Sequence, residues 1–96
     1  MIEERLPNIH PGEVLLEEFM TPLRLSQNQV ARDIGVPVHR IHQLVHHKRS
    51  VTADTALRLG KYLGTGPEFW LNLQAAFDLE EARPAVSLDG IRQVAA

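Results

Sequence analysis

The sequence predicts an all-α, five-helix domain followed by a short tail. Apolar residues recur at i, i+3 and i+4 along most of the chain, the spacing of one helix face. Glycine and proline interrupt this pattern at short intervals, as expected between helices. The 96 residues suffice for one modest core. Residues 1–83 are therefore interpreted as a single domain, and residues 84–96, which have no strong period, as a flexible tail.

The first predicted helix runs from Pro11 or Gly12 to about Met20. Glu13 lies in its first turn, where the positive end of the helix dipole favours a carboxylate. Pro22 is expected to stop this helix, because proline lacks an N–H and its ring clashes with the preceding turn. The expected apolar face consists of Val14, Leu15, Phe19 and Met20.

The next two predicted helices are separated by a tight turn. The earlier helix starts after Ser26, which together with Gln29 three residues later matches a capping box. Gly35 suits the left-handed residue that ends it. The later helix runs from about Pro37 to His46. The expected apolar faces of the two helices consist of Val30, Ala31, Ile34, Ile41, Leu44 and Val45.

Two further helices are predicted downstream. The fourth opens with Thr52 as a plausible cap and ends at Gly64. The fifth covers residues 67–82, with Pro67 in its first turn. The apolar residues of the fifth helix are Phe69, Trp70, Leu73, Ala76 and Phe77.

The second and third helices together form a helix-turn-helix pattern at about residues 26–46. In such a motif the first helix crosses the phosphate backbone, and the second lies in the major groove and presents side chains to base edges. Gly35 permits the sharp turn, because glycine adopts positive φ without steric cost. Double-stranded DNA is therefore the predicted partner.

Charge is distributed unevenly along the chain, although the net charge is only −2. The stretch from Arg24 to Lys61 contains seven basic and two acidic residues and carries +5. The flanks contain three basic and ten acidic residues and carry −7. This asymmetry favours an anionic partner for the middle of the chain and a different partner for its ends.

The chain contains no cysteine, which excludes a disulfide framework and a cysteine-ligated zinc finger. No apolar run approaches the ~18 residues that a membrane span needs. The N-terminal MIEERLPNIH is polar and acidic, unlike a secretory signal. We therefore expect a cytoplasmic, nucleoid-associated protein that does not bind membranes.

Two stretches carry a resemblance to a known family. Leu25, Gln27, Ala31, Gly35 and Val36 match the pattern L-x-Q-x-x-x-A-x-x-x-G-V and resemble the XRE family of phage-repressor-like helix-turn-helix domains. The segment VPVHRIHQLVHHKRSVTADTALRLGKYLGTGPEFWLNLQAAFDLE and the upstream HPGEVLLEEFM resemble the HigA-type antitoxin subgroup. The resemblance covers about residues 8–81. The chain departs from the family pattern at His47, where the family usually has glycine and a left-handed conformation would cost histidine more.

The resemblance implies an all-helical homodimer that binds the operator of its own operon and represses it. It also implies a toxin partner, a small ribosome-dependent mRNA endonuclease that the antitoxin neutralises. The acidic flanks could contact such a basic, RNA-binding toxin, or could simply be solvated helix faces. The acidic residues concerned are Glu3, Glu4, Glu13, Glu17, Glu18, Glu80 and Glu81.

Four of the five histidines lie within residues 39–47, and this cluster allows three interpretations. His42 and His46 are four residues apart on one helix face, which could place them around a metal ion. However, residues 34–53 contain no acidic residue that could complete or orient such a site. The histidines could also be solvated polar residues. We favour DNA contact, because an imidazole can donate or accept at base edges.

The predicted DNA-binding set consists of Gln27, Val38, His39, Arg40, His42, Gln43, Lys48 and Arg49. Val38 is expected to touch a thymine methyl, and Gln43 to bridge N6 and N7 of adenine. Arg40 could read guanine or bind phosphate. Gln27, at the start of its helix, is expected to face a phosphate, while Lys48 and Arg49 are expected to bind phosphate without sequence preference.

The apolar stripe of the fifth helix is rich for the edge of a small domain, so part of it could pack against a second copy. The predicted dimer interface comprises Phe69, Trp70, Leu73 and Phe77, although aromatic residues at helical spacing also suit a core. An enzyme is not expected, because no HExxH motif, paired nucleophile or glycine-rich phosphate loop is present. No cofactor or metal is expected. The alternative function is a stand-alone XRE-type regulator, with or without a response to metal through its histidines.

Overall fold

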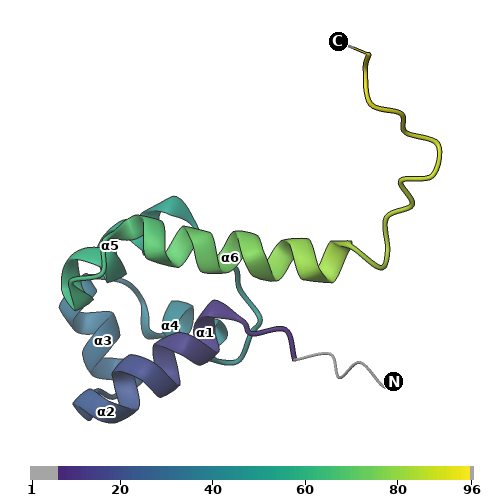
Figure 1. Cartoon of the computed structure of the whole chain (residues 1–96). Coiled ribbons are helices and arrows are strands. Elements are labelled where there is room, and N and C mark those ends of the chain that lie inside the picture. Colours follow the sequence, from purple (N-terminus) through teal and green to yellow (C-terminus); the bar gives the residue numbers. More distant parts are fainter. Residues whose placement is uncertain (1–6, 96) are drawn as a thin grey trace.

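The computed structural model describes residues 7–95, which form helices and loops without a strand (Figure 1). Glu3, Glu4 and the rest of residues 1–6, together with Ala96, lie outside the described residues. The all-α prediction is confirmed. The helical segments are α1 (Pro11–Val14), η1 (Leu15–Met20), α2 (Thr21–Leu23), α3 (Gln27–Ile34), α4 (Val38–Val45), α5 (Ala53–Leu63) and α6 (Pro67–Ala82). Since α1, η1 and α2 are continuous, these segments make five rods, as predicted.

The first rod is longer than predicted and contains a π-helical stretch, η1. The prediction that Pro22 stops this rod is wrong, because helical residues continue to Leu23. The N–H of Thr21 bonds to the carbonyl of Leu16, five residues back, so the helix is already widened where Pro22 enters it. The rod ends at Arg24, whose φ of 57° is left-handed.

The predicted ends of α3 are confirmed, and one of the two hydrogen bonds of the capping box is present. Ser26 caps the helix, its hydroxyl oxygen accepting from the N–H of Gln29 at 3.1 Å. Gly35 is left-handed at the other end, with φ 75°. The next N–H, that of Val36, bonds back to the carbonyl of Ala31 at 3.0 Å. This pattern closes the helix and turns the chain into α4 within a few residues.

The core lies where α1, α3, α4, α5 and α6 meet, and all five rods contribute to it. Trp70 is fully buried at its centre, packed on Phe19, and its ring N–H donates to the hydroxyl oxygen of Thr65 at 2.9 Å. The assignment of Trp70 to a dimer interface is therefore wrong, because its surface is already covered within one chain. The buried apolar residues are Leu15, Met20, Val30, Ala31, Ile34, Ile41, Leu44, Val45, Val51, Ala56, Leu59 and Trp70.

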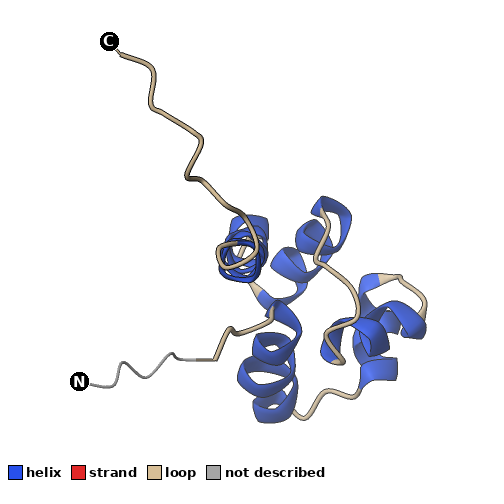
Figure 2. Cartoon of the chain, turned by 90° about the vertical axis from the view of Figure 1, so that its right-hand side faces the viewer, coloured by secondary structure: helices blue, strands red, loops and turns tan. Residues whose placement is uncertain are grey.

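Helix α6 is the longest element and packs mainly against α5 (Figures 1 and 2). Buried Gln74 joins α6 to the segment between α4 and α5. Its Oε1 accepts from the N–H of Val51 at 2.8 Å, and its Nε2 donates to Asp78 at 2.9 Å. This bond fixes the segment that follows α4 against α6.

Residues 83–95 leave the end of α6 and extend away from the helices (Figures 1 and 2). They are exposed throughout and form turns but no further helix. Their flexibility remains a prediction. Among residues 7–95, no helix has the length and apolar character needed to cross a membrane.

Candidate nucleic-acid interface

Helix α4 presents a polar outer face beside α3, in the arrangement of a helix-turn-helix. Its inner residues Ile41, Leu44 and Val45 are buried in the core, which orients the opposite face outwards. Val38, the first residue of α4, is 45% exposed, and His39 and His42 are exposed. The predicted base-reading side of α4 is thus accessible.

Gln27 and two histidines form a chain of contacts between α3 and α4. Gln27 Oε1 lies 3.3 Å from His42 Nδ1, and His46 Nδ1 lies 2.8 Å from the main-chain carbonyl oxygen of His42. Because both oxygens only accept, each Nδ1 carries the proton in these bonds. The rings of His42 and His46 also contact each other, with centroids 4.1 Å apart and planes tilted by 34°. Within residues 7–95, no three potential metal ligands lie close enough together to hold an ion.

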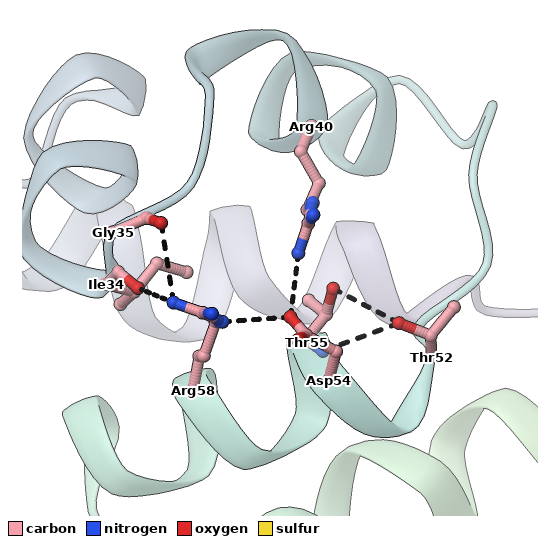
Figure 3. Close-up of polar contacts among 7 residues, drawn as sticks. All are labelled: Ile34, Gly35, Arg40, Thr52, Asp54, Thr55 and Arg58. Atoms are coloured by element: carbon pink, nitrogen blue, oxygen red, sulfur yellow. Dashed lines mark hydrogen bonds and ion pairs between the residues drawn. The ribbon is translucent and has the colours of Figure 1, made fainter.

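Arg40 is held by an ion pair with α5 (Figure 3). Its Nη1 donates to Asp54 Oδ1 at 2.8 Å, and the same oxygen accepts from Arg58 Nε at 2.8 Å. Arg58 Nη1 in turn donates to the carbonyl oxygen of Ile34 at 2.7 Å. The network therefore connects α4, which is the expected recognition helix, with the end of α3 and the first turn of α5.

The two arginines also set the charge state of Asp54. Hydrogen bonds from Arg58 and then from Arg40 lower the pKa of this carboxyl group below its ordinary value, because they favour the ionised form. A second contact joins α3 to α5: Tyr62 Oη donates to Asp33 Oδ2 at 2.6 Å, which raises the pKa of the tyrosine hydroxyl. The helix-turn-helix is thus braced by α5 at both ends of the turn.

Gln43 and Arg49, both in the predicted DNA-binding set, contact each other. Gln43 Oε1 accepts from Arg49 Nε at 3.0 Å and from Arg49 Nη2 at 2.8 Å. Both side chains are half-buried. Lys48, between them in sequence, is exposed. The structure thus gives Arg49 a partner within the chain, whereas Lys48 is exposed in the loop.

The loop after α4 rests on His10. His47 has φ 61°, the left-handed conformation for which the family pattern has glycine, and its ring stacks on His10 with centroids 4.8 Å apart. His10 is buried and caps α1, its Nδ1 accepting from the N–H of Gly12 at 2.9 Å. Burial lowers the pKa of His10, and so does the neighbouring His47.

Six of the eight predicted DNA-binding residues lie on α3 or α4, and Lys48 and Arg49 lie in the loop that follows α4. Sequence reasoning missed three residues that position them: His10, Asp54 and Arg58. Asp54 stands in the first turn of α5, where a carboxylate is expected only for the helix dipole. Its pairing with Arg40, fourteen residues away, has no sequence period that could reveal it.

The remaining residues of the predicted dimer interface lie on α6 with mixed exposure. Phe69 is 38% exposed, while Leu73 and Phe77 are half-buried. A more exposed apolar stripe follows a different face of the same helix at spacings of four and three residues. This outer stripe consists of Leu71, Ala75, Leu79 and Ala82.

The chain was compared with known proteins. No protein-family model matches it. Virulence-associated protein I of Dichelobacter nodosus is 45% identical over 80 residues, 83% of this chain and 74% of that protein. Antitoxin HigA-1 of Vibrio cholerae is 38% identical over 72 residues, 75% of this chain and 68% of that antitoxin.

Solved structures match a larger share of both chains. The antitoxin GraA in complex with its operator matches with a TM-score of 0.85 and 37% identity, covering all of both chains. The Pseudomonas aeruginosa antitoxin HigA with the higBA promoter matches with a TM-score of 0.83 and 34% identity, covering 93% of this chain and 97% of that one. The predicted resemblance to HigA-type antitoxins is confirmed. With its five helical rods, its helix-turn-helix and these similarities, the chain belongs to the HigA family of antitoxin helix-turn-helix proteins.

Proposed function

We propose that this chain is the antitoxin of a type II toxin–antitoxin pair, which binds operator DNA and represses its own operon. The observation that carries the proposal is the accessible polar face of α4 beside a closed, left-handed turn at Gly35. The GraA and HigA structures that match the chain contain an operator and a promoter, respectively, which supports the same role here.

The contacts divide into two classes. Val38, His39 and Gln43 are the candidates for base edges, because they lie on the outward side of α4. Gln27 and Lys48 are the candidates for phosphate, at the start of α3 and in the loop after α4. The stretch from Arg24 to Lys61 carries +5, which favours a polyanionic partner for the surface that this stretch forms.

The proposed active form is a homodimer, because two recognition helices about 34 Å apart would meet successive major grooves on one side of the duplex. Exposed Phe69 and the outer stripe of α6 offer apolar surface for a second copy. A groove of about 470 Å³ continues this surface beyond the end of α6. Its lining residues are Leu79, Ala82, Arg83, Val86 and Leu88.

The proposed toxin is a small ribosome-dependent mRNA endonuclease, which this chain neutralises by occupying or distorting it. Glu17, Glu18 and Glu81 are exposed and are available to a basic partner. A second candidate function is a stand-alone transcriptional regulator. It is favoured by the similarity to YbaQ of Escherichia coli, a helix-turn-helix transcriptional regulator 42% identical over 71 residues.

One experiment tests operator binding and another separates the two candidates. Binding of the full chain to duplexes from its own upstream region should exceed binding to random duplexes by a factor of at least ~10³ at physiological salt. Equal affinity for both would refute operator recognition. If the neighbouring reading frame encodes the toxin, co-expression of this chain should restore the growth that the toxin arrests. The toxin should then co-purify with this chain. A toxin-free operon with intact repression would instead establish the stand-alone regulator.

A further inference from the structure

The contact between Gln43 and Arg49 determines which polar atoms the recognition helix offers to DNA. Gln43 Oε1 accepts two hydrogen bonds, from Arg49 Nε at 3.0 Å and from Arg49 Nη2 at 2.8 Å. A guanidinium group has donors only, so the amide oxygen must face it and the amide nitrogen must face away. The two bonds together use the oxygen's two lone pairs.

This pairing leaves Gln43 with donors alone. Among residues 7–95, the polar atoms of Gln43 that have no partner are the two N–H groups of Nε2. Glutamine reads adenine by accepting from N6 and donating to N7 at the same time. That arrangement would require Gln43 to give up two hydrogen bonds from a charged group, which are stronger than neutral ones.

We propose that Gln43 selects guanine rather than adenine, with Arg49 as the positioning residue that occupies its amide oxygen. This inference rests on the proposed operator binding. On its major-groove edge guanine offers two acceptors, O6 and N7, and no donor. It therefore matches a pair of N–H groups. Cytosine presents a donor to the same atoms, and thymine presents one acceptor and a methyl group.

The half-buried position of both side chains supports this role. Because Arg49 is half-buried, its guanidinium group is less available to a phosphate than the exposed ammonium group of Lys48. Gln43 was expected from the sequence to pair with adenine, and Arg49 to bind phosphate. In this proposal Gln43 instead pairs with guanine, and Arg49 acts through Gln43.

The test measures binding of the full chain to operator duplexes in which each base pair is replaced in turn. The position at which Gln43→Ala removes discrimination is the position that Gln43 reads. At that position the unmodified chain should prefer guanine over adenine by roughly tenfold. Arg49→Met frees the amide oxygen and should shift the preference towards adenine.

Two further variants keep the test independent of folding. Gln43→Glu retains a partner for Arg49 but replaces the N–H groups with an acceptor, and should shift the preference towards cytosine. Lys48→Met removes a neighbouring charge without altering Gln43. It should lower the affinity for every duplex and leave the ranking of the duplexes by affinity unchanged.

The outcomes separate this inference from operator binding. Preference for adenine by the unmodified chain, or an unchanged guanine preference in both Arg49→Met and Gln43→Glu, would overturn the role of the pair while operator binding stood. Specific binding that Gln43→Ala leaves intact at every position would do the same. If no duplex bound better than random DNA, operator binding and this inference would fall together.

Discussion

Arg40 on the recognition helix and Asp54 on α5 form an ion pair in which Nη1 and Oδ1 are 2.8 Å apart. Asp54 binds Arg58 through the same oxygen, and Arg58 donates to the carbonyl groups of Ile34 and Gly35, where the turn begins. One exposed carboxylate therefore aligns α4 with the end of α3. We expect these contacts to hold the angle between α3 and α4.

Replacing Asp54 by asparagine should lower sequence discrimination more than stability. Asp54→Asn releases both arginines and removes one negative charge, so affinity for random DNA should rise while operator affinity falls. The ratio of the two affinities should drop by roughly fivefold or more. Glu80→Gln is the matched control, because it removes the carboxylate from another exposed ion pair, with Arg83. If the ratio of operator affinity to random-DNA affinity were the same in the two variants, Asp54 would act only through its charge.

His10 should make stability fall in acid. Burial lowers its pKa below the ordinary 6.5, as does the charge of His47, while Asp78 and a hydrogen bond to the Arg49 backbone act in the opposite direction. The unfolded chain therefore binds a proton in a range where the folded chain does not. Stability is fully present above pH 6.5 and is lost as the pH falls below it.

Substitution should remove this dependence. His10→Asn keeps an acceptor for the N–H of Gly12 but cannot take up a proton, so the melting temperature should fall less between about pH 7 and about pH 5. His39→Asn, at an exposed histidine, should melt like the unmodified chain at each pH. A His10→Asn profile parallel to that of the unmodified chain would contradict the assignment.

Gly12 marks a close approach of α1 to the recognition helix. A Cβ at this position would overlap the main-chain carbonyl of Leu44, which cannot move without shifting α4. Gly12→Ala should therefore lower the free energy of unfolding by about 1–3 kcal/mol in urea titrations. Gly90→Ala, in open space, should change it by no more than about 0.5 kcal/mol. Unchanged stability in Gly12→Ala would show that the two helices are farther apart.

Arg24 and His47 have nearly the same left-handed conformation, with φ 57° and 61°, but different surroundings. Glycine relieves about 1–2 kcal/mol of backbone strain and costs about 0.4–1 kcal/mol through the unfolded chain. Arg24→Gly should therefore stabilise the protein by up to about 1.6 kcal/mol. His47→Gly should gain less, because it also loses the ring stacked on His10. Thermal melts showing the reverse order would mean that the stacking contributes nothing.

Lys48 should contribute affinity without specificity. Lys48→Ala should weaken binding to operator and random duplexes alike, and reduce the slope of log affinity against log salt by about one. Lys61→Ala, which removes the same charge from exposed α5, should leave the slope unchanged. A selective loss of operator binding in Lys48→Ala would instead place this lysine at a base edge.

The sequence predicted the elements whose ends depend on local chemistry. Ser26 and Gly35 specify the ends of α3 through contacts within a few residues, and those contacts are present. The same holds for Thr52, which caps α5. The π-helical stretch before Pro22 escaped prediction, because no residue pattern distinguishes it from an ordinary helical turn.

The details of the site depend on contacts between distant residues. Gln43 and Arg49 were both predicted to touch DNA, but their mutual pairing follows from how the loop folds back on α4. Trp70 fits a stripe on α6 that suits either a core or an interface, and only the packing of Phe19 against it decides for the core. Periodicity identifies a face of a helix but not what covers it.

Gln74 accepts a hydrogen bond from the main-chain N–H of Val51, and the ring of His47 stacks on that of His10. The segment after α4 is therefore anchored near both of its ends. An added or deleted residue in this segment would detach one anchor or the other. Exchange of recognition residues with a relative should therefore succeed only as a substitution of equal length. DNA preference can then be transplanted side chain by side chain, on a scaffold whose spacing stays fixed.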